Sequence, residues 1–147
     1  MAENSLKFDT SREISAYLDE AGLNYSLGNG SDSYDVIAAS YTPATSEKLD
    51  RIVVQVYVYE NSASIIASAL SQPDTSDMSA LYQKLEGLND SVSFVRFLYN
   101  ARNDSIYPQV DIPYVPDAEF GRMVERYMYI TAMIVDQNYD GMAALFQ

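Results

Sequence analysis

The chain has 147 residues, of which 48% are hydrophobic and 20% charged, so it is long enough to bury the core of one domain. Its net charge of −12 repels nucleic acid and acidic membranes, and we expect neither as a partner. Cysteine and histidine are absent, which excludes disulfides, thiolate nucleophiles, the usual zinc ligands and triads with an imidazole base. We therefore expect no cofactor and no metal.

The N-terminal segment predicts a cytoplasmic protein that begins with a helix. MAENSLKFDTS contains no cationic stretch followed by an apolar run, so we expect no signal peptide. Thr10 and Glu13 match the reciprocal capping box, and Ile14 and Leu18 follow at helical spacing. This pattern predicts an amphipathic helix that Gly22 ends, followed by a polar loop over residues 26–33.

Three strands are expected next, over residues 34–42, 50–60 and 63–70. The second, DRIVVQVYVYE, is a dense run of valine, isoleucine and tyrosine. Because side chains alternate along a strand, Val54 and Val56 share one face and Tyr57 and Tyr59 the other. We expect the aliphatic face to meet helices and the tyrosine face to stay half exposed, in a three-stranded meander.

A second helix and two further strands follow. Met78, Leu81 and Leu85 repeat at helical spacing, and Gly87 is expected to end this helix. The pair Leu88-Asn89 is then a connection to a strand over residues 91–100, which the turn ARND joins to a strand over residues 105–114. Pro108 lacks a donor, so this last strand is expected to be an edge strand or locally bulged.

The longest predicted helix covers residues 115–137, with Asp117 as a candidate cap. Its apolar arc is wider than packing on one sheet face requires. We interpret the extra width as a dimer interface in a homodimer, formed by Val124, Met128, Tyr129 and Met133.

The complete order is α-β-β-β-α-β-β-α, without repeats, low-complexity tracts or linkers. Such an order predicts a single α+β domain over residues 1–147, with an antiparallel sheet and helices packed mainly on one face.

Several short patterns resemble the YbjN-like proteins, which share the fold of type III secretion chaperones. They are YDVIAASY before DRIVVQVYVYE, the pair Leu88-Asn89, FVRFLYNARND, VDIPY and the long closing helix, and they extend from Ser11 to Phe146. The resemblance implies a small, acidic, often dimeric bacterial protein with a curved sheet and helices on one side. Chaperones of this fold bind an extended segment of a client protein, and YbjN-like members are linked to regulation. The resemblance assigns no site residues.

Two aromatic regions are candidate partner-binding surfaces. Tyrosine combines a rigid apolar ring with a polar tip, so Tyr57, Tyr59 and Tyr99 suit an extended peptide, although packing at the edge of the core explains each more simply. Arg96, beside Phe97, suits a partner's carboxylate, although an internal ion pair explains it more simply. We take these five residues as the candidate partner-binding set.

Carboxylates near the last hairpin and the final helix raise a second hypothesis. Asp104, Asp111, Asp117 and Glu119 suggest a metal site or acid–base chemistry, but their spacing matches no calcium loop. Helix capping explains Asp117 and Glu119 more simply.

Three classes of function follow. The first is a non-enzymatic, chaperone-like or regulatory protein-binding domain, which the missing catalytic residue types favour. The alternative is a small-ligand sensor or carboxylate-based enzyme, with a pocket between sheet and helices. The third is a purely structural subunit of an obligate complex.

Overall fold

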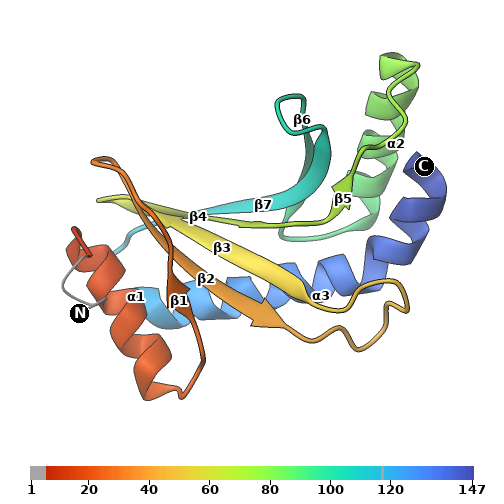
Figure 1. Ribbon diagram of the computed structural model, residues 1–147. Coiled ribbons are helices and arrows are strands. Elements are labelled where there is room, and N and C mark those ends of the chain that lie inside the picture. The colour runs from red at the N-terminus through yellow and green to blue at the C-terminus, as the bar shows by residue number, and fades with distance from the viewer. Residues whose placement is uncertain (1–5, 117) are drawn as a thin grey trace.

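The computed structural model describes residues 6–116 and 118–147 and confirms the α+β architecture (Figure 1). All eight expected elements are present in the expected order, and two strands of two residues each, β1 and β5, are added. The elements are α1 Asp9–Glu20, β1 Ser26–Leu27, β2 Asp35–Tyr41, β3 Ile52–Val58, β4 Ser62–Ala67, β5 Leu70–Ser71, α2 Met78–Ser91, β6 Arg96–Asn100, β7 Ser105–Pro113 and α3 Phe120–Phe146.

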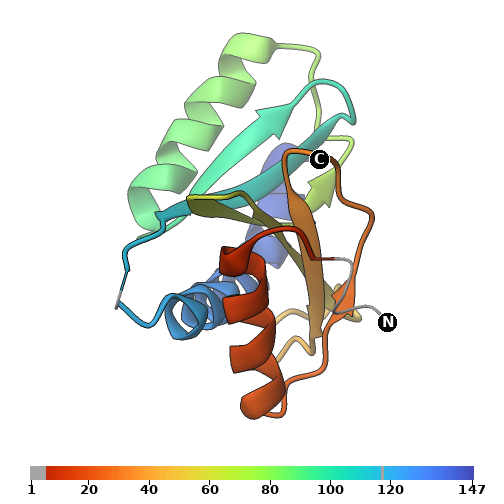
Figure 2. The same cartoon turned by 90° about the vertical axis from the view of Figure 1, so that its left-hand side faces the viewer.

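The strands form one antiparallel sheet in the order β1-β2-β3-β4-β7, and β6 pairs along the other side of β7. β5 continues the line of β4 and pairs with the other end of β7. The sheet curls, and the helices lie on one side of it (Figure 2). β7 is therefore an interior strand, with β6 at the sheet edge beside α2.

Residue alternation in β3 decides which face the helices cover. Ile52, Val54, Val56 and Val58 are buried, whereas the residues between them are half exposed, as the sequence predicts. The aliphatic face packs on α1 and α3 in one core cluster. A second cluster joins α2, β6 and the C-terminal half of α3. The opposite face of the sheet carries Gln55 and Tyr57, and none of the helices in the described residues lies over it (Figure 1).

Gly121 allows α1 and α3 to pack closely. A Cβ atom at this position would lie 2.7 Å from the Cβ of Tyr17 and 2.9 Å from the carbonyl oxygen of Glu13. Both distances are shorter than real Cβ contacts, so only glycine fits between the two helices.

The first helix starts differently from the prediction. α1 begins at Asp9 after Phe8, which makes no side-chain capping bond, and Thr10 lies inside the helix. The Thr10 hydroxyl instead donates to the carbonyl of Tyr59, 2.8 Å away. The predicted capping box is therefore wrong, because a contact distant in sequence takes the hydroxyl.

The second helix does not end at Gly87. α2 continues to Ser91, so Leu88 and Asn89 belong to the helix and not to a connection. The Asn89 side chain accepts a hydrogen bond from the Phe97 N–H (2.6 Å) and donates one to the Phe97 carbonyl (3.0 Å). It thus covers backbone groups on the outer edge of β6, which would otherwise be open to another strand.

The final helix is longer than predicted, since α3 continues to Phe146. The candidate cap Asp117 lies outside the described residues. Among residues 6–116 and 118–147, no helix combines the length and apolar character needed to cross a membrane.

Candidate functional site

The candidate partner-binding residues do not form one surface. Tyr57 and Tyr59 are half buried, and Tyr34 packs edge-on against both, with ring centroids 5.2 and 5.9 Å away. Tyr34 begins the predicted strand over residues 34–42 but was not recognised as a site residue, because only the β2–β3 register, which pairs Asp35 with Val58, brings its ring close to the other two. The three rings form a small aromatic cluster at one end of the sheet.

Around β6 the predicted set separates. Arg96 is exposed and forms no ion pair with any residue that the structure describes, so the expected internal pair is not seen there. Phe97 is only 1% exposed and packs in the second core cluster, so it is not available to a partner. Tyr99 also faces that cluster, and its hydroxyl donates to Asp104 at 2.7 Å. This hydrogen bond raises the pKa of the Tyr99 hydroxyl.

The expected dimer interface separates in the same way. Val124 and Met128 are fully buried in the chain's own core, so neither reaches the surface. Tyr129 and Met133 are exposed by 55% and 37%. The Tyr129 ring packs against Tyr41, whose hydroxyl pKa rises to about 12, through burial first and the charge of Glu125 second. The apolar arc of α3 is wide because α1 and α2 both pack on this helix.

The candidate acid cluster is dispersed. Asp104 accepts from Tyr99, Asp111 accepts from Ser64 at 2.6 Å, and Glu119 contacts Arg122. In the part of the chain that the structure describes, no three acidic side chains lie close enough together to hold a metal ion. Asp117, the fourth member of the proposed cluster, lies outside that part.

Two other carboxylates, on α3, have a structural role. Asp136 is buried and accepts hydrogen bonds from the N–H groups of Ala44, Thr45 and Ser46, at 2.7–3.1 Å. Burial raises the pKa of Asp136, but these donors outweigh that effect and hold it below its ordinary value. Asp140 accepts from the Ser46 hydroxyl, which lowers its pKa as well. The two acids hold the β2–β3 loop against the helix.

The most unusual surface residue is Phe94, in the connection from α2 to β6. Its ring is 69% exposed, and its backbone has a φ of 76°, a left-handed conformation that phenylalanine rarely adopts. The neighbouring Val95 and Phe97 are buried in the second core cluster. The Phe94 ring instead reaches α3, where it packs edge-on against Tyr127 with centroids 6.4 Å apart.

A groove lies beside this ring, between the end of α2 and the middle of α3. We call it the Phe94 groove, and its volume is about 690 Å³. Its apolar lining is Val92, Phe94, Tyr127, Ile130, Met133 and Ile134, and its polar lining is Ser91, Ser93, Arg126, Gln137 and Asn138.

The chemistry of the Phe94 groove suits binding. Its described lining offers apolar surface, amides, hydroxyls and one guanidinium, and no carboxylate. Met133 is the member of the expected dimer set that lines it. The sequence carries one signal for this site: the adjacent apolar pair Phe94-Val95 interrupts the alternation of the strand segment.

The comparisons with known proteins add no relative to this picture. Neither the protein-family models nor the curated proteins include a match to this chain.

Proposed function

We propose that this chain is a non-enzymatic polypeptide-binding protein, and that the Phe94 groove receives apolar side chains from a segment of its partner. The observation that carries the proposal is the exposed Phe94 ring on a left-handed backbone beside an apolar groove. Large exposed apolar patches mark interaction sites in folded proteins.

The energies of this arrangement support a binding role. A left-handed conformation costs a residue with a Cβ atom about 1–2 kcal/mol. Leaving two-thirds of a phenylalanine in water forgoes roughly another 1–2 kcal/mol, out of the ~1.5–3 that full burial contributes. Together they are a sizeable part of the ~5–15 kcal/mol by which a domain is stable. Strain of this kind persists at sites where function requires it.

Charge indicates the kind of partner. At a net charge of −12 the chain attracts a segment whose apolar anchors are flanked by lysine or arginine, and repels a second copy of itself. We therefore assign the groove to the apolar anchors of a basic amphipathic segment of another protein, whose lysine or arginine side chains lie outside the groove, because its described lining carries Arg126 and no carboxylate. A cytoplasmic location and the resemblance to YbjN-like proteins and secretion chaperones fit this proposal. The exposed Tyr129 and the half-buried Tyr34–Tyr57–Tyr59 cluster offer further aromatic surface to such a partner.

Peptide selection on the full chain tests the proposal. Peptides from a random displayed library are selected, and their affinities for the variants Phe94→Ser and Met133→Ser are measured by fluorescence anisotropy. We expect basic amphipathic peptides, each weakened about tenfold or more by either substitution. Leu145→Ser is the matched control, because Leu145 is 45% exposed on α3 but does not line the groove.

Two outcomes would contradict the proposal. Peptides that bind both groove variants as tightly as the unchanged chain would place recognition elsewhere. Light scattering that gives a dimer mass, reduced to the monomer mass by Phe94→Ser, would assign the groove to a second copy and restore the predicted homodimer.

A further inference from the structure

A second recess lies on the open face of the sheet, and Pro108 explains why it exists. Along β7, Gln109 pairs with Ile66 of β4 and Ile106 pairs with Leu70 of β5, with Pro108 between them. Proline has no N–H to donate to a ladder. Three residues, 67–69, lie between these two pairs on the β4–β5 side, and only two, 107 and 108, on β7. Ser68 stays with β3, because its N–H donates to the Val53 carbonyl at 3.2 Å. The β4–β5 chain therefore bends away from β7, as the bulge alternative for Pro108 anticipates.

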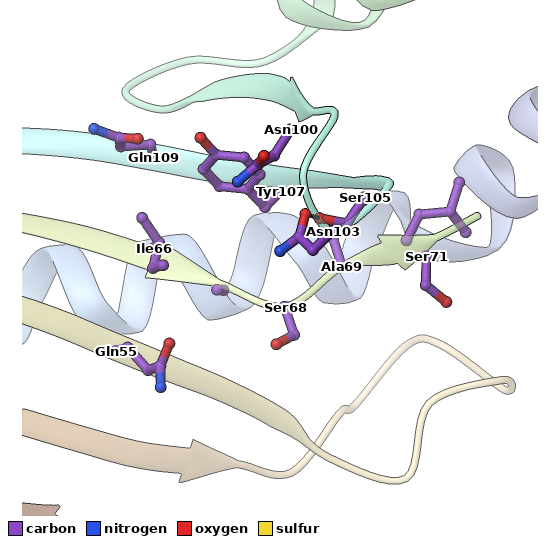
Figure 3. Close-up of a pocket in the computed structure, with 12 residues that line it drawn as sticks. Gln55, Ile66, Ser68, Ala69, Ser71, Asn100, Asn103, Ser105, Tyr107 and Gln109 are labelled. Carbon is purple, nitrogen blue, oxygen red and sulfur yellow. Dashed lines mark hydrogen bonds between the residues drawn. The ribbon is translucent and has the colours of Figure 1, made fainter. Parts of the chain in front are cut away.

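The bend leaves a recess that we call the sheet hollow, which opens on the face away from α3 (Figure 3). Its volume is about 510 Å³. None of the described residues that line it is charged, although the chain carries a net charge of −12. The polar side chains that matter here are Gln55, Ser68, Asn100, Asn103, Tyr107 and Gln109.

Neighbouring groups orient three of these amides. The Arg102 N–H donates to Asn100 Oδ1 (2.9 Å) and the Ser105 hydroxyl to Asn103 Oδ1 (2.6 Å), so both amide NH₂ groups remain as donors. Gln109 donates its own NH₂ to a carboxylate oxygen of Asp111 (3.0 Å), which leaves Gln109 Oε1 as an acceptor.

Three further side chains have unused hydrogen-bonding capacity. Gln55, Ser68 and Tyr107 make no side-chain hydrogen bond to any residue that the structure describes. They come from β3, the β4–β5 bend and β7, and Figure 3 shows the Tyr107 ring between Gln109 and Asn103. Donors, acceptors and one aromatic ring from separate strands thus surround one space.

We propose that the sheet hollow binds a neutral, hydroxyl-rich small molecule of the saccharide class. Sugar hydroxyls both donate and accept, which matches amide and hydroxyl side chains, and the apolar face of a sugar ring packs on an aromatic ring such as Tyr107. A volume near 510 Å³ lies within the ~300–1,000 Å³ of small-ligand sites and exceeds what one side chain fills. The lining offers no counter-charge to an anion or a cation.

This site is distinct from the Phe94 groove and does not depend on the proposed polypeptide binding. It also differs from the pocket between sheet and helices expected for a small-ligand sensor, because the described residues that line the sheet hollow come from strands and the segments that connect them, and none comes from a helix.

Nuclear magnetic resonance of the full chain, labelled with ¹⁵N, tests the inference. Glucose, galactose, mannose, maltose, lactose and sucrose are each titrated to millimolar concentrations, and the side-chain amide signals of Gln55, Asn100 and Asn103 are followed. We expect saturable shifts of these signals with at least one sugar. Tyr107→Ala and Gln55→Ala weaken binding about tenfold, the loss typical of one important contact. Ser40→Ala is the control, because Ser40 is exposed on β2 outside the sheet hollow, and we expect this substitution to leave the sugar affinity unchanged.

Glucose 6-phosphate and glucuronate, which are charged, test whether the site prefers neutral sugars. We expect both to bind more weakly than glucose. Comparing the free disaccharide with the same disaccharide on a neutral peptide distinguishes a free sugar from a protein-borne glycan. The inference is overturned if none of the six sugars gives saturable shifts, if Tyr107→Ala leaves them unaltered while the variant's spectrum remains folded, or if the charged sugars bind equally well.

Discussion

The backbone at Phe94 predicts an inverted order of stability between two substitutions. Phe94→Ala and Phe94→Gly both remove the ring, its contact with Tyr127 and the same buried area, so these losses cancel when the two variants are compared. What remains is the φ of 76°, which alanine adopts at a cost of about 1–2 kcal/mol and glycine without one.

Glycine also gives the unfolded chain more conformational freedom, which lowers the free energy of unfolding of the glycine variant relative to the alanine variant by ~0.4–1 kcal/mol. The net result is that Phe94→Gly should be the more stable of the pair by about 1 kcal/mol, or roughly 2–4 °C in melting temperature for a domain of this size. At ordinary helical positions the order is the reverse, and glycine is the less stable by about 1 kcal/mol.

Urea unfolding followed by circular dichroism measures the difference. Met133, an exposed position within α3, is the control, and we expect Met133→Gly to be less stable there than Met133→Ala. If Phe94→Gly were equal to Phe94→Ala or less stable, the backbone at Phe94 would carry no strain, and the energetic support for a binding role would be lost.

Three further predictions concern the internal hydrogen bonds. Asp136→Asn should destabilise the fold by about 1.5–3 kcal/mol, because the new NH₂ group is itself a donor and would face the backbone N–H groups that Asp136 now accepts from. Amide hydrogen exchange at residues 44–46 should become faster. The pKa values of Asp35, Asp136 and Asp140 are lowered from 3.8, so their stabilisation is present above that pH and lost as the pH falls below it. An acid titration of stability should therefore be flatter in Asp136→Asn than in the unchanged chain. Asn89→Ala should uncover the edge of β6 and promote self-association, measured by light scattering as a function of concentration; a mass that stays constant would contradict this.

Local patterns predict much of this fold because they record which face of an element is buried. The alternation of Ile52, Val54, Val56 and Val58 identified both faces of β3 correctly. Pro108 indicated the interrupted ladder, because the missing N–H has the same consequence in any sheet. The α+β class follows from the order of such elements.

Contacts distant in sequence explain what local patterns missed. Asn89 is a poor interior helix residue by propensity, yet α2 includes it because Phe97, eight residues later, bonds its side chain. Asp136 lies at the end of the predicted helix over residues 115–137, and Asp140 lies beyond it. The hydrogen-bonding partners of both are about ninety residues away in the sequence. Phe94 was assigned to a strand, since no residue pattern encodes a left-handed φ at a phenylalanine.

Photo-crosslinking from position 94 identifies what occupies the Phe94 groove in the cell. Phe94→p-benzoylphenylalanine is expressed in the native host, irradiated, and the crosslinked segment is mapped by mass spectrometry, with Leu145→p-benzoylphenylalanine as the matched site outside the groove. We predict a crosslink from position 94, and not from position 145, to an apolar segment of another protein that is flanked by lysine or arginine. The same products from both positions, or a crosslink from position 94 to a second copy of this chain, would contradict it.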